Sequence, residues 1–106
     1  MRETNRLPTK RQPARQSVLT SKLIRLVIDE FPISPKGHHG TAHWMRVRAN
    51  GLLLAAETGA NPAVIELFAL FHDSQRHNEG TDPDHGKRGA RNAVRYREMG
   101  AFEVSD

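Results

Sequence analysis

The sequence has no cysteine, no long apolar run and few aromatic residues. Without cysteine the chain can form neither disulfides nor thiolate metal sites, so any metal must be held by nitrogen and oxygen ligands. No apolar run approaches the roughly 18 residues of a membrane span, and the first residues lack the apolar segment of a secretory signal. These absences favour a cytoplasmic protein with no membrane partner.

Positive charge is concentrated at the start of the chain. Residues 1–25 carry seven Lys or Arg and one Glu, a net charge of +6, whereas residues 26–106 carry nine basic and eleven acidic residues, a net charge of −2. No aromatic residue precedes Phe31, so none interleaves with these early basic residues. The overall charge of +4 therefore supports a nucleic-acid partner only weakly, and that alternative stays open.

The chain length suits a single domain, because 106 residues bury one modest core. Residues 1–14 contain two prolines and no periodic apolar pattern, which predicts a flexible basic arm. Residues 15–106 are then the folded domain. Apolar residues at helical spacing, without a convincing strand pattern, predict an all-α domain of about four to five helices.

Proline, glycine and capping residues set the expected helix ends. The third helix, residues 63–71, follows the Asn61-Pro62 capping signal and has Glu66 as its only charge, so we expect it to be the central buried helix. The other three expected helices begin at Ser17 and stop at Pro32, run over residues 41–58 before Gly59, and begin at the Asp82-Pro83 signal and reach Met99.

A metal site is indicated where the third helix ends in His72-Asp73. A histidine and a carboxylate at the end of a buried helix lose hydration unless something pairs with them, and a bound cation is one such partner; capping of nearby backbone groups is the structural alternative. If the second and third helices pack antiparallel, His43 meets this pair. Two imidazoles and one carboxylate form a reasonable half-shell for a divalent metal.

Three segments together resemble the HD-domain metal-dependent phosphohydrolases. They are His43-Trp44-Met45-Arg46-Val47, Leu67-Phe68-Ala69-Leu70-Phe71-His72-Asp73-Ser74 and Asp82-Pro83-Asp84-His85-Gly86. The resemblance implies an HD-like helical fold and a metal, one of Mn, Fe, Ni, Zn or Mg, bound by His43, His72 and Asp73. Asp73 and His85 are the candidate catalytic residues, and Arg76 and Lys87 are candidates for binding the substrate phosphate.

By this resemblance we expect metal-dependent hydrolysis of a nucleotide or another small phosphate ester. The sequence departs from the family pattern after Asp73, because Asp82, Asp84 and Asp106 are the only later aspartates and none lies on a further helix where the family places its last ligand. The domain is accordingly expected to be truncated before that ligand. The alternative is a catalytically inactive HD-like binding or scaffold module.

The apolar third helix also predicts self-association. It needs neighbours on every side, and three other helices are too few to cover it. A large uncovered apolar face generally marks an interface, which predicts a twofold homodimer. The partner subunit could lend a carboxylate to the metal, and the candidates are Glu79, Asp84, Glu103 and Asp106.

Overall fold

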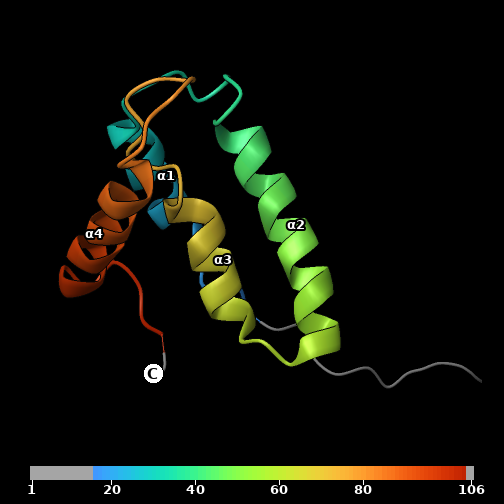
Figure 1. Cartoon of the computed structure of the whole chain (residues 1–106). Helices are drawn as coiled ribbons and strands as arrows, with labels where there is room; N and C mark the ends of the chain where they lie inside the picture. Colours follow the sequence, from blue (N-terminus) through green and yellow to red (C-terminus); the bar gives the residue numbers. More distant parts are fainter. Residues whose placement is uncertain (1–15, 105–106) are drawn as a thin grey trace, which may run out of the picture.

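In the computed structural model, residues 16–104 are described, and they form four α-helices with no strand among them (Figure 1). The helices are α1 (Ser21–Glu30), α2 (Thr41–Thr58), α3 (Pro62–Phe71) and α4 (His85–Glu98). The predicted all-α class is confirmed. The predicted arm, residues 1–14, lies outside the described residues. No helix in the described part of the chain is long and apolar enough to cross a membrane.

The ends of α2 and α3 follow from local sequence signals, as predicted. Gly59 ends α2 with a φ of 80°, a left-handed conformation that glycine adopts without steric cost. The side chain of Asn61 then accepts a hydrogen bond from the Ala63 N–H at 2.9 Å, and Pro62 is the first residue of α3. The connection between the end of α2 at Thr58 and the start of α3 at Pro62 is therefore short, and the two helices form an antiparallel pair.

The first helix begins at Ser21 rather than at Ser17, so that part of the prediction was wrong. Thr20 is the true cap, because its hydroxyl accepts the Leu23 N–H at 3.1 Å. The Ser17 hydroxyl and the Val18 N–H instead donate to Glu66 of α3, at 2.8 and 3.3 Å. A long-range contact to a buried carboxylate therefore competes with helix formation in this segment.

The fourth helix also begins later than predicted, at His85 after Asp84. The Asp82 carboxylate is not used as a cap: it accepts the His77 N–H at 2.8 Å and forms an ion pair with Arg88 at 2.6 Å. The capping signal at Asp82 thus closes the loop before α4 instead of starting the helix. The predicted end near Met99 is confirmed, since Gly100 follows with a φ of 78°.

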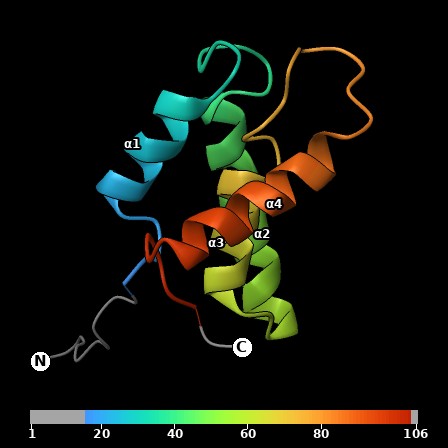
Figure 2. The ribbon, with the colours of Figure 1, turned by 90° about the vertical axis from the view of Figure 1, so that its left-hand side faces the viewer.

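Helix α3 lies at the centre of the fold and contacts each of the other three helices (Figures 1 and 2). Its buried apolar residues pack against α1, the start of α2, α4 and the segment after α4. Aromatic contacts tie these parts together, with Phe71 edge-on to Tyr96 at 5.5 Å between ring centroids. The core consists of Leu23, Val27, Phe31, Trp44, Leu67, Leu70, Phe71, Tyr96 and Phe102.

The burial of α3 is incomplete, as expected from the small number of helices available to cover it. Val64 and Phe68 are 51% and 59% exposed, although their neighbours on the helix are in the core. The one charged residue of the helix, Glu66, is fully buried. Arg48 of α2 compensates this charge with an ion pair of 2.7 Å to the Glu66 carboxylate.

Candidate metal centre

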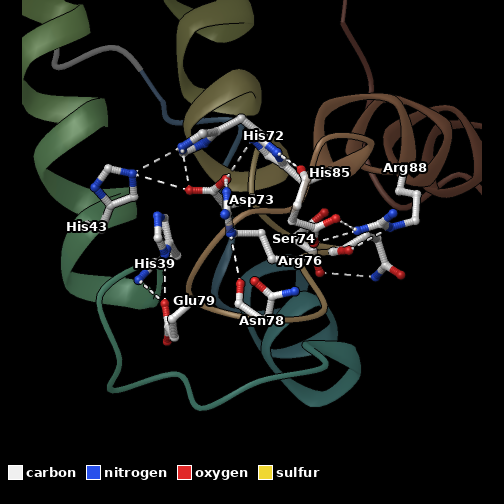
Figure 3. Close-up of polar contacts among 12 residues, drawn as sticks. His39, His43, His72, Asp73, Ser74, Arg76, Asn78, Glu79, His85 and Arg88 are labelled. Atoms are coloured by element: carbon white, nitrogen blue, oxygen red, sulfur yellow. Dashed lines mark hydrogen bonds and ion pairs between the residues drawn. The ribbon is translucent and has the colours of Figure 1, made fainter.

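The antiparallel pairing of α2 and α3 brings together the three residues predicted to bind a metal. His43 lies in the first turn of α2, and His72 and Asp73 follow the last turn of α3, so the start of one helix lies beside the end of the other (Figure 3). One ligand atom from each residue can be chosen so that all three lie within 4.8 Å of one another. Among the described residues, this is the one such group of three.

The three side chains point their acceptor atoms at a common place. Nε2 of His43 lies 3.3 Å from Oδ2 of Asp73, and Nε2 of His72 lies 3.1 Å from the same oxygen. The two Nε2 atoms are 3.3 Å apart. Two nitrogen donors and one carboxylate oxygen make a ligand set suited to Mn, Fe, Ni or Zn, and less suited to Mg, which prefers oxygen ligands.

Hydrogen bonding to the backbone selects the tautomer of His72 that metal binding requires. Nδ1 of His72 lies 3.1 Å from the carbonyl oxygens of both Phe68 and Ala69, so this nitrogen carries the hydrogen and donates it. In the neutral ring Nε2 is then a bare acceptor directed at Asp73 Oδ2. Two acceptors at this distance repel each other unless a positive charge lies between them. The backbone of α3 thus acts on His72 as the outer partners of metal-bound histidines do.

A metal and a proton are the two ways to supply that positive charge. Burial lowers the pKa of His43, and the neighbouring His72 lowers the same pKa further. Protonation of His43 is accordingly disfavoured near neutral pH, where a neutral imidazole can bind a metal. The lowered pKa of His43 therefore leaves its ring in the form that can act as a metal ligand.

The Asp73 carboxylate is 2% exposed and uses its two oxygens differently (Figure 3). Oδ2 faces His43 and His72, whereas Oδ1 lies 3.4 Å from the Arg76 guanidinium and 3.5 Å from Nε2 of His85. His85 comes from the first turn of α4, and its Nδ1 donates to the carbonyl of Asp82 at 2.7 Å. The fold consequently places His85 beside Asp73, on the opposite oxygen from the two predicted histidine ligands.

The two residues predicted to bind phosphate lie in different surroundings. Arg76 is buried and directed at protein acceptors: besides Asp73, it donates to the carbonyls of Asn78 at 3.1 Å and Gly80 at 2.6 Å. Lys87 is exposed on α4. The structure therefore brings Arg76 to the centre as a support for Asp73 and leaves Lys87 on the surface.

A second polar pair, between His39 and Glu79, was not predicted as a unit. Nδ1 of His39 lies 2.7 Å from Oε1 of Glu79, and the His39 N–H donates to the same oxygen at 3.1 Å. The side-chain hydrogen bond from His39 is the main cause that lowers the pKa of Glu79. The His39 carbonyl accepts the Trp44 indole N–H at 2.7 Å. This pair joins the loop before α2 to the loop after α3, with the His39 ring edge-on to that of His43.

The carboxylates considered as further ligands are placed elsewhere. Glu79 is engaged by His39, Asp84 is exposed at the start of α4, and Glu103 is exposed in the final segment. Asp106 lies outside the described residues. Within residues 16–104, the metal centre therefore has three candidate protein ligands from one chain.

Comparison of the chain with models of protein families, with curated proteins and with solved structures gives no match. What the site can do chemically thus follows from its own geometry. A buried carboxylate with two imidazole nitrogens can hold a divalent cation through three protein atoms, which would leave other coordination positions for water or a ligand. Such an open site is typical of catalytic rather than structural metals.

Proposed function

We propose that the protein binds a divalent transition metal through His43, His72 and Asp73 and hydrolyses a small phosphate ester. The observation that carries this proposal is the convergence of three acceptor atoms within 4.8 Å, with the Nδ1 side of His72 fixed by backbone carbonyls. The resemblance of the three sequence segments to HD-domain phosphohydrolases supports the reaction class. A nucleotide is one candidate substrate under this proposal.

Under this proposal, Asp73, His85 and Lys87 would each have a separate role in the reaction. The metal, when bound, would polarise a phosphoryl oxygen and activate a water molecule for attack. Asp73 would orient the metal and the water relative to each other, because its second oxygen is already held by Arg76 at 3.4 Å. His85, at 3.5 Å from Asp73, would neutralise charge that develops on the phosphoryl oxygens. Lys87 would attract the phosphate from the exposed start of α4.

The alternative function is a binding module that holds a metal without turnover. The observation in its favour is that residues 16–104 supply three candidate ligands, and none of the described later aspartates reaches the group. A domain with this shell would bind the metal more weakly and leave the water less well oriented. Metal binding with no hydrolysis of any phosphate ester is the result expected of this alternative.

The first test is direct metal binding. Equilibrium dialysis against Mn²⁺, Ni²⁺ and Zn²⁺ should give about one ion per chain, and His72→Ala should lower the affinity by more than about 100-fold, because a direct ligand matters at least as much as its supporting partners. The matched control is His38→Ala, since His38 is an exposed loop histidine outside the group. Equal affinity in wild type and His72→Ala would show that the metal lies elsewhere.

The second test separates enzyme from binding module. The purified protein, loaded with each metal in turn, is screened against a panel of phosphomonoesters and nucleotides for release of inorganic phosphate. Activity that is lost in His72→Ala and retained in His38→Ala supports the enzyme. Tight metal binding with no phosphate release from any ester would instead support the binding module.

A further inference from the structure

An apolar groove with a volume of about 400 Å³ lies between α3 and α4, next to the candidate metal centre. This volume is within the range of small-molecule sites. Val64 and Phe68 form its α3 wall, Ala90 and Val94 form its α4 wall, and Phe102 closes it from the final segment. Of all the side chains that line it, His72 and Arg97 are the two that carry polar groups.

The groove exists because small residues on α4 face α3. A Cβ atom at Gly89 would collide with the carbonyl of Phe71, so glycine allows the start of α4 to approach the end of α3 closely. From this contact the two helices diverge (Figure 1). Gly86, Ala90 and Ala93 line the resulting space without filling it.

The groove is continuous with the metal centre through His72. The ring of His72 stacks on that of Phe68, with 5.0 Å between centroids and an interplanar angle of 17°, and both rings line the groove. At the same time Nε2 of His72 faces Asp73 and His43. At the α4 end Gly86 follows His85 directly. A molecule held at the metal by one end would therefore have its other end beside the groove.

The chemistry of the lining selects an apolar group. The donor nitrogen of His72 is already bonded to carbonyls of α3, and Arg97 donates to the carbonyl of Val104 at 3.3 Å. A base or a sugar would lose hydration in the groove without gaining matching partners. An alkyl or aryl group would instead cover Val64, Phe68 and Val94, which are all more than half exposed.

We propose that this groove binds the organic group of the substrate, and that the substrate class is phosphate esters of apolar alkyl or aryl alcohols rather than nucleotides. The inference rests on the proposed function for its phosphate end, whereas its apolar end rests on the groove alone. The first 15 residues, with Met1 and Leu7 as their only large apolar residues, are poorly suited to occupy it instead.

The experiment measures binding of two phosphonates, which cannot be hydrolysed, to the metal-loaded full chain by calorimetry. Hexylphosphonate should bind at least about tenfold more tightly than methylphosphonate, because each methylene that leaves water contributes roughly fourfold. Ala90→Phe should fill the groove and abolish this preference while leaving methylphosphonate binding unchanged. Ala56→Phe is the matched control, since Ala56 is an exposed helical alanine that does not line the groove.

Two further measurements distinguish failure of the groove proposal from failure of a variant to fold and from failure of the proposed metal site. If Ala90→Phe fails to fold, Val94→Ser serves as the second variant. It removes apolar lining without adding bulk, so it should also reduce the preference for hexylphosphonate. The same pair of ligands is tested on metal-free protein. If this protein still prefers hexylphosphonate and dialysis shows no bound metal, the groove is retained and the proposed metal site is rejected. Equal affinities for both phosphonates would overturn the groove proposal. Dissociation of a dimer by Ala90→Phe would overturn it too, by assigning the groove to a second copy.

Discussion

Asp73 shows how one buried side chain can organise a site. A carboxylate that is 2% exposed loses most of its hydration, and here four cationic or polarisable groups surround it: His43, His72, Arg76 and His85. The Arg76 guanidinium is held in turn by two backbone carbonyls, which limits its ability to swing away. The contacts with Arg76 and His85 therefore hold one oxygen of Asp73, while the other is directed at the two histidines.

The grouping of His43, His72 and Asp73 was predictable from the sequence, whereas the contacts that support Asp73 were not. A His-Asp pair after an apolar helix and a histidine at the start of the preceding helix are local signals that a short helix connection converts into proximity. The orientation of Arg76 depends on a loop conformation that no periodicity encodes. The His39–Glu79 pair joins residues 40 apart in sequence, so only the folded loops reveal it.

Tyr96, the single tyrosine, provides a residue-level prediction. Burial first, and then the hydrogen bond to Glu30 at 2.8 Å, raise its pKa from 10.0 to about 12. Its stabilising contribution is thus complete below pH 10 and is lost as the pH rises through about 12. Glu30→Gln should move this pKa toward 10 without reaching it, because burial remains. Ultraviolet absorbance of the phenolate measures the change.

The control for this titration is Glu57→Gln, because Glu57 is exposed on α2, away from Tyr96. It should leave the phenol pKa where it is in the wild type. A wild-type tyrosine that titrates at its ordinary value would contradict the contact between α1 and α4.

At the scale of elements, the loop before α4 depends on Asp82. The hydrogen bond from Arg88, followed by that from the His77 N–H, lowers the pKa of Asp82 to about 2. Because the folded pKa is depressed, this group stabilises the fold above about pH 4, and its contribution disappears as the pH falls toward 2. Asp82→Asn should lower the melting temperature at neutral pH, and the difference from wild type should shrink below pH 4.

Thermal unfolding followed by circular dichroism across this pH range measures the effect. Asp84→Asn is the matched control, since Asp84 stands at the helix start but makes no capping hydrogen bond with its side chain. A deficit in Asp82→Asn that is the same at every pH would show that the carboxylate charge is not the cause.

The helices themselves were largely predictable, and the two errors share one physical cause. For α2 and α3, Gly59, Asn61 and Pro62 are used at the helix ends as their local signals indicate. Ser17 and Asp82 also look like caps, but both are used by contacts formed elsewhere, to Glu66 and to Arg88. Tertiary contacts therefore moved the starts of α1 and α4, although the pattern of apolar residues identified both helices.

For the whole molecule, the contact of Ser17 and Val18 with Glu66 defines where the chain can be shortened. Removal of residues 1–14 should leave the melting temperature nearly unchanged, because this segment offers little apolar surface to offset the entropy of ordering it. Removal of residues 1–18 should lower it clearly, since Glu66 loses two hydrogen-bond donors. Calorimetry of the two shortened chains compares them directly. A large loss in the shorter deletion would contradict the predicted flexible arm.

The homodimer expected from the sequence remains a prediction, and the structure shows two apolar surfaces that bear on it. One is the groove beside α3, and the other includes Leu53 and Leu54 of α2, which are 71% and 62% exposed. The sequence placed the dimer interface on the uncovered face of α3, which lines the groove. Because we propose that the groove binds substrate, we now expect a dimer that uses α2 instead. Sedimentation at micromolar concentration should show a dimer that Leu53→Ser with Leu54→Ser dissociates. Sedimentation as a monomer would reject the association.

The single tryptophan has a further consequence for this molecule. Trp44 is fully buried, it follows His43 in the chain, and its indole N–H is bonded to the loop that carries His39. Its fluorescence has no other indole to mask it, and ions such as Ni²⁺ and Cu²⁺ quench indole emission at short range. The unlabelled chain consequently carries an optical reporter beside the proposed metal site, so that one titration curve of emission against added ion tests whether the site binds that ion.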